Sequence, residues 1–206
     1  MIAFLLSVAS DVVASIIVAV GAWLSRRMWL TGFYSDIAKV YTSKARGLKA
    51  INKDIAKSNS VRILSVRGKS IVDSDVYASL WDSTQLQKRI EIITSSPDND
   101  AVIIERSQAN NTSRDEYRTE MQFAYNVLMI KKQEFQNLSI FQHMESPSFK
   151  LIILDQCLYV SYYLREKNVN KSRLIKYKSN NGAYDAFLHY YETTKKHSTE
   201  MQEGNA

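Results

Sequence analysis

The chain has 206 residues, of which 45% are hydrophobic and 23% are charged, a composition that excludes a disordered chain and suits one globular domain with a short additional segment. The single cysteine, Cys157, lies in an apolar run, which excludes a disulfide framework and a cysteine metal cluster and suits a reducing, cytoplasmic setting. A formal net charge of +6 is compatible with phosphate-bearing ligands, but the charge is spread along the chain and identifies no partner.

The amino-terminal segment is almost entirely apolar. Residues 1–24 carry one charge, Asp11, and a helix of this length, at about 1.5 Å per residue, spans a bilayer core of roughly 30 Å. We therefore expect a single transmembrane helix and its interfacial flank within residues 1–30. Arg26 and Arg27 follow the apolar run, which argues against a cleaved signal peptide and predicts that the carboxyl-terminal domain is cytoplasmic.

Small and polar side chains recur at every fourth position of this helix, at Ser7, Asp11, Ser15 and Ala19. Small residues let two helices approach closely and hydroxyls can hydrogen-bond between them, so this face predicts self-association into a dimer or a larger oligomer. Asp11 either lies within the bilayer, facing a partner or water, or lies at the outer surface if the span is shifted toward residues 12–30. The sequence leaves both placements open.

Residues 31–58 predict an amphipathic linker helix with Ser35 as its amino-terminal cap. Such a helix could associate with its copies, rest on anionic lipid headgroups or cover the sheet that follows, and the pattern does not choose among these three roles. Its apolar stripe consists of Ile37, Val40, Tyr41, Leu48, Ile51 and Ile55.

From residue 61 onward, short apolar runs alternate with longer amphipathic segments, which is typical of an α/β domain. We expect this domain at residues 59–197 and a polar, frayed tail at residues 198–206. No glycine-rich phosphate loop and no histidine or cysteine metal spacing occurs in the sequence, so we expect no cofactor and no metal. The predicted strands are 62–66, 90–94, 138–141, 149–154, 158–162 and 173–177; the predicted helices are 76–88, 114–133 and 184–194; loops are predicted at 95–100 and 179–182.

The order of these elements, together with the stretch SPSFKLIILDQCLYVSYYLREKN, resembles one half of the phospholipase D superfamily, the HKD proteins. The signature of that family is His-x-Lys-x4-Asp on a strand, followed by a second strand and an asparagine. Lys150 and Asp155 match its lysine and aspartate, and Asn168 or Asn170 stands where the asparagine is expected. Ser148 occupies the position of the histidine.

This departure bears on the chemistry that the resemblance, which covers roughly residues 61–177, implies. The family's histidine is a nucleophile in one half and a proton donor in the other, and a serine hydroxyl without a neighbouring base does neither well. His143 is a poor substitute, because it lies upstream of Pro147. The resemblance thus implies a phospholipase D-like mixed sheet flanked by helices, which pairs with a second copy and binds phosphate without turnover through Lys150, Ser148 and the asparagine amides.

The alternative for Lys150 is a lysine at a strand edge that pairs with a carboxylate such as Asp155 or Glu145. Further along, residues 167–184 mix basic residues with tyrosine and asparagine, a composition that suits a nucleotide or a nucleic acid but also an ordinary solvated surface.

A self-associating membrane helix joined to a cytoplasmic domain without the histidine is the layout expected of a bacterial membrane effector in an antiphage or toxin system. A phosphate-bearing signal or a partner protein would trigger the soluble domain, and the helices would then cluster in the inner (cytoplasmic) membrane and permeabilise it. The expected partners are a second copy of the chain, the lipid bilayer, and a nucleotide, a nucleic acid or a regulatory protein. A membrane-anchored phospholipase or nuclease of the same superfamily and a passive anchor or scaffold are the alternatives.

Overall fold

The computed structural model describes residues 36–73, 76–82, 84, 87–163 and 173–202. The described residues from Ala38 onward form one compact unit. The predicted transmembrane helix of residues 1–30 lies outside the described residues. Among the helices that the structure does describe, none is both long enough and apolar enough to cross a membrane.

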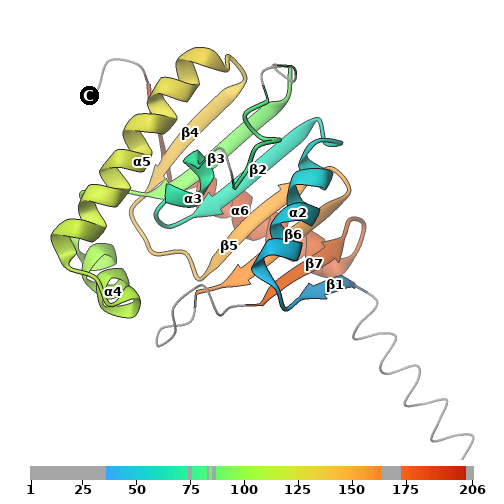
Figure 1. The fold of residues 1–206 in the computed structure, drawn as a ribbon, viewed down its shortest axis with the longest axis horizontal. Helices are drawn as coiled ribbons and strands as arrows, with labels where there is room; N and C mark the ends of the chain where they lie inside the picture. Colours follow the sequence, from blue (N-terminus) through green and yellow to red (C-terminus); the bar gives the residue numbers. More distant parts are fainter. Residues whose placement is uncertain (1–35, 74–75, 83, 85–86, 164–172, 203–206) are drawn as a thin grey trace, which may run out of the picture. The chain divides into compact units, whose positions relative to one another are not determined.

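Within the described residues, one mixed sheet of eight strands runs in the order β1-β7-β6-β5-β2-β3-β4-β8 (Figure 1). β2, β3 and β4 are parallel to one another, whereas β5 is antiparallel to β2, β6 to β5, β7 to β6 and β8 to β4. The strands are β1 (Ile37–Tyr41), β2 (Ser60–Ser65), β3 (Arg89–Ser95), β4 (Leu138–His143), β5 (Phe149–Leu154), β6 (Cys157–Tyr162), β7 (Leu174–Lys178) and β8 (Thr199–Glu200).

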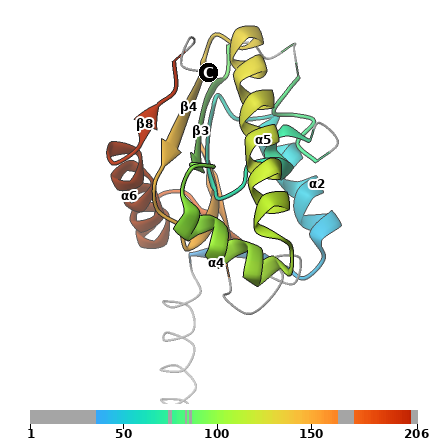
Figure 2. The ribbon, with the colours of Figure 1, turned by 90° about the vertical axis from the view of Figure 1, so that its left-hand side faces the viewer.

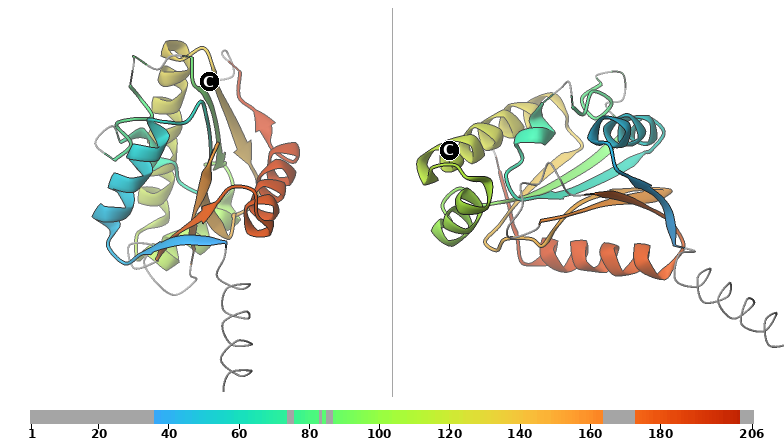
Figure 3. Two further views of the ribbon diagram at one scale, coloured as in Figure 1. Left: turned by 90° about the vertical axis from the view of Figure 1, so that its right-hand side faces the viewer. Right: turned by 60° about the horizontal axis from the view of Figure 1, so that its bottom comes forward.

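Helices cover both faces of this sheet. α6 (Gly182–Lys196) lies on one face, and α2 (Lys44–Ile55), α3 (Lys69–Val72) and α5 (Arg114–Glu134) lie on the other (Figures 2 and 3). α4 (Asp100–Asn110) precedes α5 and packs against it at one end of the sheet. The result is an α/β domain of three layers.

The central strands are apolar on both faces because both faces are covered by helices. β3 is buried over residues 90–95, and Ile63 of β2 and Ile152 of β5 are buried in the main core cluster. Such runs of β-branched residues favour strands over helices. The strand predicted at 149–154 is confirmed with the same bounds, and the other five predicted strands are confirmed to within two residues at each end.

The two longer carboxyl-terminal helices were also predicted from the sequence. α5 begins after Ser113, whose hydroxyl accepts a hydrogen bond from the backbone of Glu116 at 3.1 Å. α6 begins after Asn181, whose side chain accepts a hydrogen bond from the backbone of Tyr184 at 2.8 Å. Both helices thus begin at a side-chain cap of a residue type that favours helix starts.

The single helix predicted over residues 31–58 is wrong in its first half. Residues Ile37–Tyr41 form the edge strand β1, and the helix begins only at Lys44, after Ser43. Ile51 and Ile55 of this helix are at most 1% exposed and belong to the main core. Of the three roles that the sequence left open, the structure therefore supports the helix that covers the sheet.

The helix predicted at 76–88 is also wrong in its first half, since residues 76–81 form turns and bends. Tyr77 and Leu80 are 2% exposed, so their helix-like spacing reflects a turn that inserts two side chains into the core. The indole of Trp81 donates a hydrogen bond to the carbonyl of Ile71 at 2.7 Å, which ties this turn to α3. Hydrophobic spacing alone cannot distinguish these two arrangements.

Three further elements were missed, namely α3, α4 and β8. The loop predicted at 95–100 ends at Asn99, whose side chain accepts hydrogen bonds from the backbone amides of Ala101 and Val102 and caps α4. In the tail that was predicted to fray, Thr199–Glu200 pairs with β4 as β8. The start of α4 is therefore fixed by a cap within a predicted loop, and β8 is fixed by pairing with a strand that is distant in the sequence.

Candidate anion-binding site

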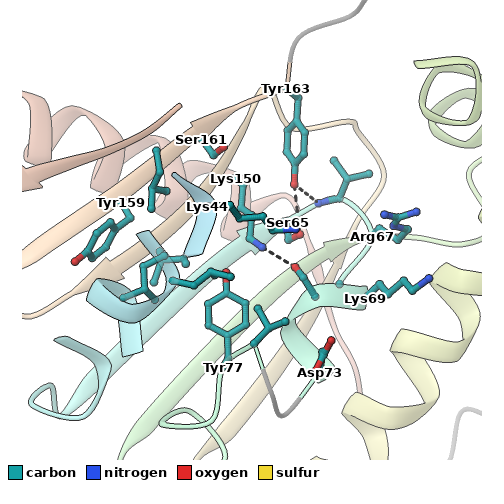
Figure 4. A pocket seen from close by; sticks show the side chains of 18 of the residues that line it. Lys44, Ser65, Arg67, Lys69, Asp73, Tyr77, Lys150, Tyr159, Ser161 and Tyr163 are labelled. Carbon is teal, nitrogen blue, oxygen red and sulfur yellow. Dashed lines mark hydrogen bonds between the residues drawn. The ribbon is translucent and has the colours of Figure 1, made fainter. Parts of the chain in front are cut away.

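A cavity of about 400 Å³ lies on the face of the sheet that α2 and α3 cover. Its walls come from the β1–α2 junction, from α2, from the segment that joins β2 to α3, from α4 and from β5, β6 and β7. Figure 4 shows the side chains of β5 and β6 at its floor and the β2–α3 segment at its side. Segments from 41 to 174 along the chain thus meet at one site.

The pairing of β5 with β6 forms the floor of the cavity. Successive cross-strand pairs on this face, called levels here, are polar and then apolar. Lys150 pairs with Ser161, and Ile152 pairs with Tyr159, so these four residues occupy two neighbouring levels on the same face. Alternate residues of a strand are about 7 Å apart along it. Phe149 points to the other face, where its ring lies 5.4 Å from that of Phe187 in α6. The alternation explains why a lysine directly follows a half-buried phenylalanine.

Lys150 is the central cation of the cavity. Its Nζ donates a hydrogen bond to Ser70 Oγ at 2.7 Å and lies 5.1 Å from the centroid of the Tyr77 ring (Figure 4). Burial lowers the pKa of Lys150, but Tyr77 and Tyr163 raise it, and the net pKa lies above its ordinary value. The ammonium group is therefore charged at neutral pH.

None of the described carboxylates pairs with this charge. In the part of the chain that the structure describes, no Asp or Glu oxygen lies within 4.0 Å of the Lys150 Nζ. The alternative in which Lys150 pairs with Asp155 or Glu145 is therefore not observed. A charged lysine whose described contacts are the hydroxyl of Ser70 and the side chain of Tyr77 is suited to an incoming anion.

Two more cations follow β2 in the segment that lines the cavity. Arg67 and Lys69 both pair with the carboxylate of Glu120 on α5. The guanidinium of Arg67 also lies 5.3 Å from the centroid of the Tyr117 ring. Burial raises the pKa of Glu120, but Lys69 and Arg67 lower it, and the net pKa lies below its ordinary value. Glu120 is therefore charged near neutral pH and holds both cations in place.

Arg106 reaches the cavity from α4 and organises its rim. It is 5% exposed; its Nε donates to Ser146 Oγ at 2.8 Å and its Nη2 donates to the carbonyl of Pro147 at 3.1 Å. Its guanidinium lies 4.8 Å from the centroid of the Tyr163 ring. Sequence analysis missed Arg106 because it missed α4, although the Asn99 cap before an apolar run was a usable signal.

The residues predicted from the family signature are only partly brought together. Lys150 lines the cavity, but Ser148 is exposed and does not line it; the carbonyl of Ser148 accepts a hydrogen bond from the Tyr163 amide at 3.0 Å. Asp155 lies beyond the opposite end of β5, is exposed and accepts a hydrogen bond from the Asn59 amide at 2.7 Å. The remaining predicted residues, which lie outside the described part of the chain, are Asn168, Asn170, Ser7, Asp11, Ser15 and Ala19.

Histidine chemistry is not available among the described residues that line the cavity, because none of them is a histidine. His143 is buried at the end of β4, where its Nδ1 lies 3.4 Å from Ser198 Oγ and its Nε2 lies 3.8 Å from a Glu145 oxygen. Nowhere in the described residues do three or more His, Cys, Asp or Glu side chains group in a way that could hold a metal ion.

Three solved structures share this architecture. NucT from Helicobacter pylori matches 79% of this chain and 98% of its own, with a TM-score of 0.52 and 10% identity. Nuc from Salmonella typhimurium, a phospholipase D family member, matches 80% of this chain and 99% of its own, with a TM-score of 0.51 and 11% identity. TrmBL2, an archaeal chromatin protein that binds DNA, matches 93% of this chain and 67% of its own, with a TM-score of 0.50 and 8% identity.

These similarities identify a phospholipase D-like fold, a mixed α/β sheet flanked by helices, as the sequence resemblance implied. At such low identities the likeness extends to the fold alone. No family model matches the chain, and no curated protein sequence matches it.

Proposed function

We propose that this protein uses its phospholipase D-like domain to bind a small phosphate-bearing ligand at Lys150 without hydrolysing it. The observation that carries the proposal is the environment of Lys150, which is charged, lies at the floor of a cavity and has no carboxylate partner among the described residues. A phosphate oxygen would supply the missing negative charge and could also accept hydrogen bonds from the nearby hydroxyls of Ser70 and Ser161.

The lack of turnover follows from what surrounds the cation. Attack on a phosphodiester requires a nucleophile that a general base activates, or an imidazole that does both tasks. The hydroxyls of Ser65, Ser70 and Ser161 line the cavity, but no histidine does so among the described residues. The hydroxyl of Tyr163 accepts a hydrogen bond from the Val66 amide at 3.3 Å and lies 3.4 Å from Ser65 Oγ, within hydrogen-bonding distance. The site can therefore hold an anion, and among the described residues that line it no imidazole is available to transfer one.

Equilibrium binding of inorganic phosphate and pyrophosphate to the full-length protein in detergent tests this proposal. We expect Lys150→Met, which keeps the length of the side chain and removes its charge, to weaken binding at least about tenfold. The matched control is Lys57→Met, which removes the same charge from an exposed residue outside the cavity and should leave binding unchanged. Equal losses in both variants, or none in either, would reject a site at Lys150.

We further propose that this domain belongs to a membrane effector of a bacterial antiphage or toxin system. The support is the apolar segment 1–24, with its face of Ser7, Asp11, Ser15 and Ala19, followed by a binding domain. On overproduction in bacteria, the wild-type protein should depolarise the inner membrane, as measured with a voltage-sensitive dye, and Asp11→Leu should reduce this effect. If no depolarisation occurs, the role is that of a passive anchor or scaffold.

A membrane-anchored phosphodiesterase is the second candidate, and the fold shared with Nuc and NucT favours it. Incubation of the full-length protein with DNA and with phospholipid vesicles separates the two candidates. We expect no hydrolysis above background. Product formation that disappears in Ser148→Ala or His143→Ala but persists in Lys57→Met would favour the enzyme and reject the binding protein.

A further inference from the structure

The cavity around Lys150 has far more positive than negative charge. Asp73 is the only acidic residue among the described residues that line it. The basic residues that line it are Lys44, Arg67, Lys69, Arg106, Lys150 and Arg173. A ligand with a single negative charge would balance only a small part of this excess.

The described carboxylates near Arg67, Lys69 and Arg106 leave these cations only partly balanced. Glu120 is shared between Arg67 and Lys69, so one negative charge serves two positive ones. A carboxylate oxygen of Glu105 lies 3.8 Å from Nη2 of Arg106. Lys150 has no such partner in the described residues. The β2–α3 segment and the floor of β5 therefore each present positive charge to the same space.

The cations also act on one another. Burial is the largest influence on the pKa of Lys150 and lowers it, Tyr77 and Tyr163 raise it, and the charge of Arg67 again lowers it. Arg67 and Lys150 line the same cavity, where their positive charges repel each other. A ligand with linked anionic groups would contact both cations at once and remove this repulsion.

The opposite wall of the cavity suits an organic group. One level along the floor from Lys150, Ile152 and Tyr159 are apolar, and Leu48, Ile51 and Val76 line the same cavity. The edge of this wall is formed by Tyr41, Thr42 and Ser43 at the β1–α2 junction, which add an aromatic ring and hydroxyls. A volume of about 400 Å³ lies within the range of cavities that take small organic ligands.

We infer that the ligand is a nucleoside di- or triphosphate, with one phosphate at Lys150 and Ser70, the next at Arg67, and the nucleoside against the wall of Ile152 and Tyr41. Glu120 competes with the second phosphate for Arg67 and Lys69, which makes it a residue that sets affinity. This inference rests on the proposed binding of phosphate at Lys150 and adds the number of phosphates and the nature of the organic group.

The test compares AMP, ADP, ATP, pyrophosphate and a dinucleotide phosphodiester as probes, by calorimetry on the full-length protein in detergent. ADP should bind at least about tenfold more tightly than AMP, because it makes an additional charge-assisted contact, and more tightly than pyrophosphate, because of its nucleoside. The singly charged phosphodiester should bind no better than AMP. If it binds as well as ADP, the site recognises a diester and the inference is wrong.

Variants of Arg67 and Glu120 locate the second phosphate. Arg67→Met should weaken ADP about tenfold and AMP little, and Glu120→Gln should strengthen ADP several-fold, because the competing carboxylate is gone. Glu116→Gln, one turn earlier on α5 and exposed, is the matched control and should change nothing. In Arg67→Met alone, ADP affinity could fall because a contact with the phosphate is lost or because Glu120 is left without Arg67 and repels the ligand. The double variant Arg67→Met with Glu120→Gln removes both charges. If the lost contact is the cause, the double variant should still bind ADP more weakly than the wild type.

The possible failures are distinguishable. Suppose that Lys150→Met abolishes phosphate binding. If AMP and ADP then bind the wild type with equal affinity, or Arg67→Met weakens both equally, the phosphate site is supported but the nucleoside polyphosphate is rejected. If pyrophosphate binds as tightly as ADP, the nucleoside is rejected while the second phosphate stands. If binding of every probe is indifferent to Lys150, the proposed function fails together with this inference.

Discussion

Glu91 pairs with several cations on the face of the sheet that α6 covers. Its replacement by glutamine should destabilise the domain. Its side chain is only 3% exposed. One carboxylate oxygen accepts a hydrogen bond from Arg89 at 2.5 Å and lies 3.0 Å from the Nζ of Lys195. The Nε of Arg62 lies 3.7 Å from the other oxygen. One buried carboxylate therefore faces three cations from β2, β3 and α6.

Glu91→Gln keeps the size of the side chain and removes its charge. A hydrogen bond to a charged group contributes about 1.5–3 kcal/mol, and Glu91 has two close cationic partners. The oxygen that faces Arg62 has no hydrogen-bond partner among the described residues, so the cost of burying it offsets part of this gain. We expect the free energy of unfolding to fall by about 2–3 kcal/mol and the melting temperature by roughly 4–12 °C.

The effect should depend on pH in a defined direction. Burial raises the pKa of Glu91, but Lys195 and Arg89 lower it, and the net pKa lies below the ordinary value of 4.5. A carboxylate with a lowered pKa in the folded state contributes stability that is fully present above its unfolded pKa and is lost as the pH falls through the folded one. The difference in stability between wild type and Glu91→Gln should therefore be constant near neutral pH and shrink below pH 4.5.

Urea unfolding of the full-length protein in detergent, followed by tryptophan fluorescence, measures this difference. The control is Glu192→Gln on α6, whose carboxylate is 42% exposed and lies 3.8 Å from Arg62. This exposed pair should contribute less than about 1 kcal/mol. If the unfolding midpoint of Glu91→Gln equals that of the wild type, or if Glu192→Gln costs as much, the buried carboxylate does not hold these cations as argued.

Three further predictions concern Cys157, Gly68 and Arg106. Burial, reinforced by Asp54, raises the pKa of Cys157 to about 12, so iodoacetamide at pH 8 should modify this thiol in the folded protein far more slowly than in urea, and equal rates would contradict its burial. Gly68 has a φ of +72°, and a Cβ at this position would lie 3.2 Å from Thr94. Gly68→Ala should therefore lower the free energy of unfolding in urea by about 1–2 kcal/mol and weaken phosphate binding, because it displaces the β2–α3 segment. An unchanged unfolding midpoint would show that the backbone at this position is not strained. Arg106→Lys should weaken phosphate binding several-fold, because an ammonium cannot hold Ser146, Pro147 and the Tyr163 ring together, and wild-type affinity would show that the rim needs only a charge.

The sequence by itself was sufficient for the elements whose signals are local. The buried run of Phe149–Leu154 predicts a strand wherever it pairs, and the caps at Ser113 and Asn181 mark the starts of α5 and α6. The position of Lys150 just inside a strand also follows from the alternation of side chains. These features depend on neighbours within a few residues, which the sequence displays directly.

The tertiary structure decided those features that depend on distant partners. Residues Ile37–Tyr41 have helical spacing but form a strand at the edge of the sheet, beside β7. The apolar spacing of Tyr77 and Leu80 serves a turn because the core accepts their side chains there. In both cases long-range pairing and packing outweigh local propensity, which amounts to less than about 1 kcal/mol per residue.

The site shows the same division. The spacing of Lys150 and Asp155 matched the family signature, but the two residues lie at opposite ends of β5, so spacing in the sequence did not correspond to proximity in the cavity. Arg67, Arg106 and Tyr77 come from three other segments and meet Lys150 only because the strand order brings β2 beside β5 and the chain returns over that face. The sequence therefore determined the central cation, and the tertiary structure alone decided which charges surround it.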